Sequence, residues 1–173
     1  MFDTNHRFLP AALIGFGLVL LLGAFGYIRL NDLTQHPGSE PLPEQLLNLP
    51  LNMSSIGQVA VTEFTSLHGE DFPVSSGAVG MYGDDHQATL WVAGTPLKPI
   101  ADRLLAAMHE KIEQGGSPFI PKGDRKDGSR VIYELDGMGQ KHFYFQSGRR
   151  IIWLAAGPDF ADQALSQVLK FYP

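Results

Sequence analysis

Two short segments bring imidazole and carboxylate groups together, which is the chemistry of a divalent-cation site. They are His68-Gly69-Glu70-Asp71 and Asp84-Asp85-His86. Both lie where turns are expected, and turns at the same end of a sheet would let one ion take ligands from both segments. Acidic turns are also ordinary on solvated hairpins, and the spacing matches no specific metal motif. We therefore expect no resident metal, and the candidate ligands for one are His68, Glu70, Asp71, Asp84, Asp85 and His86.

The sequence lacks the motifs of nucleophilic, phosphoryl-transfer and metal-dependent enzymes. It contains no G-x-S-x-G, no G-x-x-x-x-G-K-[ST], no G-x-G-x-x-G opening a helix and no H-E-x-x-H. It also has no cysteine, which excludes disulfides, thiolate metal clusters and a cysteine nucleophile. Catalysis would need carboxylates that converge only in the fold, and Glu63, Glu134 and Asp136 are the ones to inspect for a buried pair. We expect a protein that is not an enzyme and holds no cofactor.

Several aromatic residues fall at strand positions that could share one face of a sheet. If both helices of the domain cover the other face, this one is an open aromatic surface that a partner would cover. Alternatively, Trp91 and Trp153 fill equivalent core positions. A register error of one residue would exchange the two faces. The residues expected on the open face are Thr89, Trp91, Tyr133, Tyr144 and Trp153.

The elements that must carry these residues begin with an apolar segment. From Phe8 to Ile28 there are 21 residues without a charge. At about 1.5 Å per residue, this length matches the ~30 Å hydrocarbon core of a bilayer. We expect a cytoplasmic tail over residues 1–7 and one transmembrane helix over 8–30. A cleaved signal peptide with Ala24-Phe25-Gly26 as its cleavage site is the alternative, but the apolar run exceeds the ~7–15 residues typical of such peptides.

The distribution of charge orients the span. The stretch from Leu30 to Leu97 holds 68 residues, with no Lys or Arg and eight acidic residues. A loop this poor in cations is typical of the translocated side, so the N-terminus is expected in the cytoplasm and the domain in the periplasm or outside the cell. Arg29, which nearly balances Arg7, opposes this assignment. A net charge of -5 with no basic-aromatic stripe excludes nucleic acid as a partner.

Small residues recur along the predicted span at spacings of 3, 4, 4 and 3. At about 100° per residue they share one face of the helix, where a second helix could approach closely. This pattern predicts other membrane-protein subunits as partners, besides the lipid bilayer. Glycine is also simply common in membrane helices, which is the alternative explanation. The residues of this small-residue stripe are Ala12, Gly15, Val19, Gly23 and Gly26.

After the span, we expect a Pro-rich linker over residues 31–52 that spaces a domain of residues 53–173 from the membrane. The domain contains two similar stretches, Thr89–Gly94 and Ile151–Ala156, each an apolar strand with a Trp that leads into an amphipathic helix. This similarity suggests a duplicated β-β-β-α unit over about 56–114 and 129–173. Strands are predicted over 59–67, 77–82, 87–93, 130–135, 141–146 and 149–155, and helices over 99–114 and 158–171.

These elements predict an α+β domain of about six strands with two helices on one face. The polar connection over 114–129 is expected to be a solvated loop. The favoured function is that of a single-pass, non-catalytic accessory or structural subunit, whose extracytoplasmic domain braces or recognises a larger membrane assembly. A respiratory or photosynthetic complex would be a natural host. The alternative is a membrane-tethered binding module for a small ligand, a metal or an envelope component, and the sequence names no such ligand.

Overall fold

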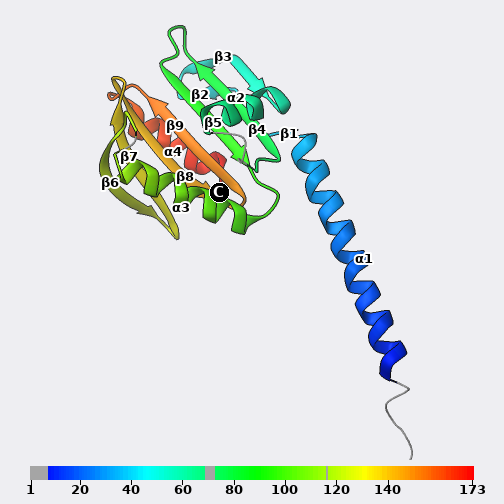
Figure 1. The fold of residues 1–173 in the computed structure, drawn as a ribbon. Helices are drawn as coiled ribbons and strands as arrows, with labels where there is room; N and C mark the ends of the chain where they lie inside the picture. Colours follow the sequence, from blue (N-terminus) through cyan, green and yellow to red (C-terminus); the bar gives the residue numbers. More distant parts are fainter. Residues whose placement is uncertain (1–7, 69–72, 116) are drawn as a thin grey trace, which may run out of the picture.

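The computed structural model describes residues 8–68, 73–115 and 117–173 (Figure 1). Helix α1 (Phe8–Gln35) projects from a domain built of one sheet and three further helices. Among the described residues, α1 is the one helix long and apolar enough to cross a membrane, and its segment Leu13–Gln35 is not buried against the rest of the chain. It continues five residues beyond the predicted end at residue 30.

The domain holds a nine-stranded sheet in the order β2-β3-β4-β5-β9-β8-β7-β6, in which β1 also pairs with β4. All pairs are antiparallel except β1 with β4. The α+β class and the N-terminal helix predicted from the sequence are confirmed. The strands are β1 (Gly38–Ser39), β2 (Gln45–Leu46), β3 (Leu49–Ile56), β4 (Ser76–Tyr82), β5 (Ala88–Gly94), β6 (Ile120–Asp127), β7 (Arg130–Gly137), β8 (Gln140–Ser147) and β9 (Arg150–Ala156).

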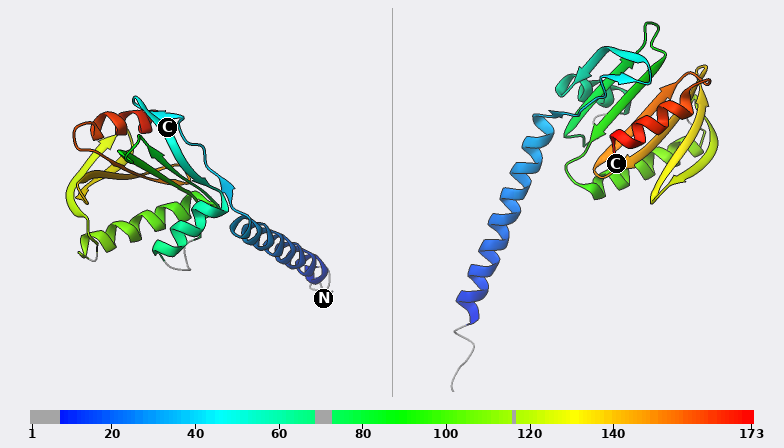
Figure 2. Two further views of the ribbon diagram at one scale, coloured as in Figure 1. Left: turned by 90° about the horizontal axis from the view of Figure 1, so that it is seen from above. Right: turned by 180° about the vertical axis from the view of Figure 1, so that it is seen from behind.

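Helices cover both faces of this sheet. Figure 2 shows α4 (Ala161–Phe171) on one side, and α2 (Gln58–His68) and α3 (Lys98–Glu113) on the other. The main core lies under α4, where Leu165 and Val168 pack with strand residues such as Phe143. The expected placement of both predicted helices on one face is therefore wrong. Helix α3 crosses from β5 to β6, which point the same way in the sheet with three strands between them. The handedness rule for such crossovers could not be applied from the sequence, because the sequence predicts a loop over 114–129 where β6 lies.

The stretch predicted as a strand over 59–67 is helix α2. Its valines and threonines have strand propensity, but the threonine hydroxyls bond helix carbonyls, as Thr65 does with Val61. Ala60, Val61 and Phe64 form one apolar face of the helix that packs on Val79 of β4. Burial of this face overrides the local preference.

Residues 38–52 do not form a free spacer, contrary to the expectation of a tether. They contain β1, β2 and the beginning of β3, and Leu46 is fully buried in the main core. The predicted solvated loop over 114–129 likewise contains β6, whose charged sequence KGDRKD pairs with β7 at the edge of the sheet. Such polar edge strands carry no apolar alternation, so the periodicity does not reveal them.

The two similar stretches meet at the centre of the sheet. Trp91 of β5 lies directly opposite Trp153 of β9 in the antiparallel pair. A two-fold axis between these strands would place α3 and α4 on the same face, whereas they lie on opposite faces. The helices thus depart from the symmetry that a duplicated unit would have.

Candidate functional site

In the sequence, the two acidic segments precede and follow β4. The Asp84-Asp85-His86 turn follows the end of this strand and is exposed, and Asp84 accepts a hydrogen bond from Asn52 at 3.2 Å. Glu70 and Asp71 lie outside the described residues, as does the side chain of His68, in the connection that leads to the beginning of β4. Among the residues that the structure describes, no three His, Cys, Asp or Glu side chains could hold one metal ion.

The five residues predicted on an open sheet face do share one face, but that face is covered. Tyr144 is 1% exposed and Thr89 is 7% exposed, while Trp91, Tyr133 and Trp153 are half-buried. The prediction of an open surface is wrong because α2 and α3 lie over this face.

Three of these aromatic rings form a continuous stack across neighbouring strands. The Tyr133 and Tyr144 ring centroids are 4.8 Å apart, and those of Tyr144 and Trp153 are 5.1 Å apart, with interplanar angles of 20° and 14°. His109 of α3 stacks on Tyr133 at 4.2 Å, and its Nδ1 lies 2.9 Å from the Tyr144 hydroxyl. Burial raises the pKa of Tyr144, so this hydroxyl stays protonated. The stack therefore fixes α3 on the sheet.

A second imidazole lies beside the stack. The Trp153 indole N–H donates to His142 Nδ1 at 3.0 Å, and the His142 Nε2 lies 3.0 Å from the Gly137 carbonyl oxygen. Because Nδ1 accepts, Nε2 must carry the proton, which makes this imidazole neutral. Burial lowers the pKa of His142 and favours the same state. Both ring nitrogens are occupied by the protein itself, so His142 has a structural role.

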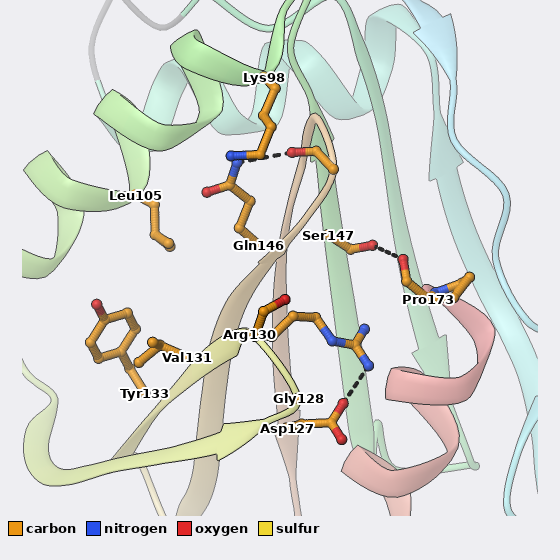
Figure 3. Close-up of a pocket in the computed structure, with 12 residues that line it drawn as sticks. Lys98, Leu105, Asp127, Gly128, Arg130, Val131, Tyr133, Gln146, Ser147 and Pro173 are labelled. Carbon is orange, nitrogen blue, oxygen red and sulfur yellow. Dashed lines mark hydrogen bonds and ion pairs between the residues drawn. The ribbon is translucent and has the colours of Figure 1, made fainter.

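A groove of about 840 Å³ opens beside the stack, between α3 and the tips of the β6–β7 and β8–β9 hairpins (Figure 3). Leu105, Val131 and Tyr133 supply apolar lining, and Lys98 and Gln146 stand at its rim. Gln146 donates to Asp102 at 2.6 Å. The groove therefore combines apolar side chains from α3 and β7 with polar side chains from α3 and β8.

The three carboxylates singled out for catalysis are separate. Glu63 lies on α2, while Glu134 is paired with Arg125 at 2.7 Å and with Lys141 at 3.5 Å. Asp136 is paired with Lys122 at 3.0 Å. None of the three forms a buried acid pair with another within the described ranges.

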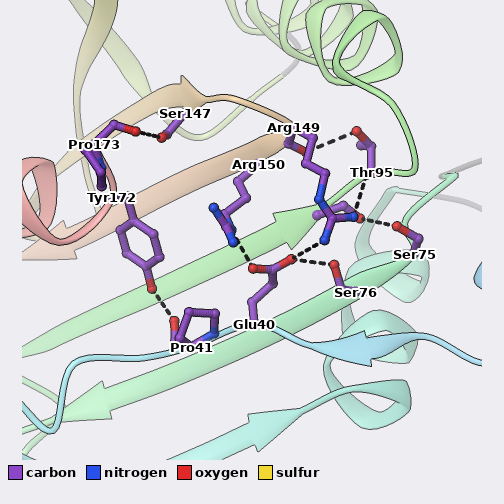
Figure 4. A network of polar contacts seen from close by, with 11 residues as sticks. Glu40, Pro41, Ser75, Ser76, Thr95, Ser147, Arg149, Arg150, Tyr172 and Pro173 are labelled. Atoms are coloured by element: carbon purple, nitrogen blue, oxygen red, sulfur yellow. Dashed lines mark hydrogen bonds and ion pairs between the residues drawn. The ribbon is translucent and has the colours of Figure 1, made fainter.

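A buried ion pair attaches the segment after α1 to the sheet (Figure 4). The Glu40 side chain is 2% exposed and accepts from Arg150 Nε at 2.5 Å, with Arg149 at 3.7 Å. It also accepts from the Ser76 hydroxyl at 2.5 Å. Nearby, the Tyr172 hydroxyl donates to the Pro41 carbonyl oxygen at 2.5 Å. We call this set of contacts the Glu40 latch.

The sequence analysis does not identify Glu40 and Arg150 of the latch, or His109 and His142 beside the stack. The prolines around Glu40 predict a linker there, and its partner lies 110 residues away. The one usable signal was the Arg149-Arg150 pair at the head of an otherwise apolar strand, since a cation there requires an acidic partner.

The small-residue stripe of α1 faces open space. Added Cβ atoms at Gly15, Gly23 and Gly26 would meet nothing within 4 Å. Position 12 belongs to α1, but its side chain lies outside the described set. The stripe is therefore not used by the described part of this chain.

Comparison with protein-family models, with curated proteins and with solved structures finds no match for this chain.

Proposed function

We propose that this chain is a single-pass, membrane-anchored, non-catalytic accessory subunit, whose sheet domain lies on the extracytoplasmic side and braces or recognises a larger membrane assembly. The orientation follows from the cation-free stretch after α1. The apolar surface of α1 supports the membrane assignment, because side chains such as Leu21 and Leu22 are about 70% exposed and would be costly to leave in water.

The observation that carries this proposal is the short connection between α1 and the sheet. Only His36 and Pro37 separate the end of α1 at Gln35 from β1 at Gly38. The three steps from Gln35 to Gly38 span at most about 11 Å, so the domain is held close to the end of α1. The Glu40 latch then fixes β1 and the following residues to β4 and β9.

This connection distinguishes the proposed function from its alternative. A module that searches for a ligand in the envelope benefits from a long flexible tether. A subunit that braces a neighbour needs its domain held close to its span, and the two-residue connection followed by the latch supports this. The unused small-residue stripe supplies a surface on which a neighbouring span could pack.

Native mass measurement after gentle detergent extraction tests the proposal. We expect the chain to co-purify with at least one integral membrane protein. Gly23→Leu, on the stripe, should release that partner, whereas Gly17→Leu, about 200° around the helix from Gly15, should retain it. Both glycines have open space at the Cβ position, so the two substitutions are matched. A partner-free monomer from the native membrane would contradict the proposal.

The groove beside α3 favours a second candidate function, that of a membrane-tethered binding module. Its volume of about 840 Å³ lies within the range of small-molecule sites. Thermal unfolding of the full chain in detergent, with a panel of amino acids, sugars, phosphate esters and divalent cations, tests this function. A saturable rise in Tm that Val131→Trp abolishes would support the binding module over the accessory subunit.

A further inference from the structure

One end of the sheet lies beside the end of α1. The register places Gly38 opposite Ser76, Ser76 opposite Gly94, and Gly94 opposite Arg150. Strand neighbours are about 4.8 Å apart, so this end of β5 lies within roughly 10 Å of β1. The views of Figures 1 and 2 agree that the beginning of α3, which follows β5, lies next to the end of α1. We call this the α1-proximal end.

Among the described residues of the sheet and α3, the α1-proximal end has an excess of positive charge. Its acidic groups in these elements are paired with cations: Glu40 with Arg150 at 2.5 Å, and Asp102 with Lys98 at 2.7 Å. Asp127 is likewise paired with Arg130. Arg103 has no ion pair within the described part of the chain, and Arg149 adds a second cation at Glu40. The residues that contribute are Lys98, Arg103, Arg130, Arg149 and Arg150 against Glu40, Asp102 and Asp127.

The opposite end of the sheet has the opposite charge. Asp84, Asp85 and Asp159 are exposed there and have no cation partner within the described ranges. Lys122 and Lys141 at this end are paired with carboxylates. The described residues of the sheet and α3 therefore separate their charge along the strands, with the positive end toward α1.

A large apolar side chain stands among the cations of the α1-proximal end. Leu97, which precedes the first residue of α3, is 51% exposed. Its backbone is fixed, since its carbonyl oxygen accepts from the Thr95 hydroxyl at 2.9 Å. An exposed leucine beside lysine and arginine matches the boundary between acyl chains and anionic headgroups.

We propose that the α1-proximal end docks on the anionic lipid surface of the bilayer, with Leu97 inserted at the headgroup level and Lys98, Arg103 and Arg149 facing lipid phosphates. This inference rests on the proposed membrane anchoring by α1. Distance permits it: α1 extends six residues, about 9 Å, beyond Arg29, and the β1 connection adds at most about 11 Å. The docked surface fixes the tilt of the domain, which a bracing subunit requires.

The cysteine-free sequence allows single-cysteine labelling of the full chain in vesicles. A polarity-sensitive fluorophore at Pro99→Cys, adjacent to Leu97, reports on docking, and the same fluorophore at Met138→Cys reports on the distant β7–β8 turn, where Met138 is 81% exposed. We expect blue-shifted emission and quenching by lipid-attached spin labels at position 99 in phosphatidylcholine vesicles that contain phosphatidylglycerol. Phosphatidylcholine alone should give weaker quenching, and position 138 none.

Charge reversal tests the stated chemistry. Arg103→Glu should lower the docked fraction at position 99 roughly tenfold, and Leu97→Ser should reduce it as well, whereas Lys122→Glu at the opposite end should leave it unchanged. Flotation of the chain with the vesicles separates the two proposals. If the chain floats but position 99 stays solvent-exposed, or is quenched equally without the anionic lipid, docking is refuted and anchoring stands. If the chain does not float, the anchoring itself fails.

Discussion

Neutralising Glu40 is expected to weaken both the sheet and its attachment to α1. In Glu40→Gln, the side chain keeps its shape but loses its charge. The Arg150 and Arg149 guanidinium groups, 2.5 Å and 3.7 Å away, then lose their carboxylate partner, and the Ser76 hydroxyl loses a charged acceptor.

The burial of the pair sets the magnitude. Removing one partner of a fully buried ion pair costs about 3–5 kcal/mol. Glu40 is 2% exposed but Arg150 is 34% exposed, so the arginine can be rehydrated and the cost falls to the lower limit, about 3 kcal/mol. For a chain of this size, that corresponds to a decrease in Tm of about 10 °C.

Urea unfolding in detergent, followed by tryptophan fluorescence, measures this cost. The two tryptophans, Trp91 and Trp153, lie on central strands and report on the sheet. Glu44→Gln is the matched control because Glu44 is exposed in the same segment; its effect should stay within about 0.5 kcal/mol. Limited proteolysis should also show faster cleavage after residue 36 in Glu40→Gln. Equal stability and equal cleavage in the two variants would refute the argument for a latch.

Three further perturbations test the surroundings of the latch and of the aromatic stack. Gly94→Ala should destabilise the domain by about 1–3 kcal/mol in the same urea assay, since its Cβ would lie 2.4 Å from Glu40 Oε1; an unchanged midpoint would contradict the placement of Glu40. Tyr144→Phe should lower the free energy of unfolding by about 1 kcal/mol, because it removes the hydrogen bond to His109 of α3. Tyr133→Phe is the control and should be nearly neutral, because the Tyr133 hydroxyl has no hydrogen bond within the described residues. Burial lowers the pKa of His142. Its contribution to stability is therefore complete above its ordinary pKa of about 6.5 and is lost as the pH falls below that value. Between pH 7.5 and 5.5, His142→Phe should lose less stability than the wild type, and an identical loss would refute this assignment.

The central part of the fold could be predicted from the sequence because it follows simple periodicities. Alternation around Phe143 and Phe145 predicts a strand with one face in the core, and those residues do lie in the core under α4. The apolar run 151–156 predicts a central strand covered by a helix on at least one side, and β9 is covered on both sides. The amphipathic stripe of 99–114 predicts α3 within one residue at each end.

The remainder depends on contacts between distant residues. Helix α2 forms because its face with Phe64 is buried against β4, although its valines and threonines favour a strand. Residues 38–47 join the sheet because Glu40 meets an arginine 110 positions later. In neither contact does the local sequence reveal which distant residue is the partner.

The candidate site shows the same limit. The alternation of side chains along each strand is sufficient to place four aromatic residues on one face of the sheet: Trp91, Tyr133, Tyr144 and Trp153. It could not show which face α3 covers, because the crossover through α3 ends at β6, a polar strand that the apolar pattern does not reveal. The open aromatic surface predicted from the sequence is consequently an interior layer, and the open surfaces are the groove beside it and the α1-proximal end.

The most direct test of the account is the membrane topology of the full chain. In sealed right-side-out vesicles, a membrane-impermeant maleimide should label Met138→Cys without detergent and Thr4→Cys only after permeabilisation. The reverse pattern, or labelling of both positions in sealed vesicles, would contradict a domain held outside the cytoplasm by α1.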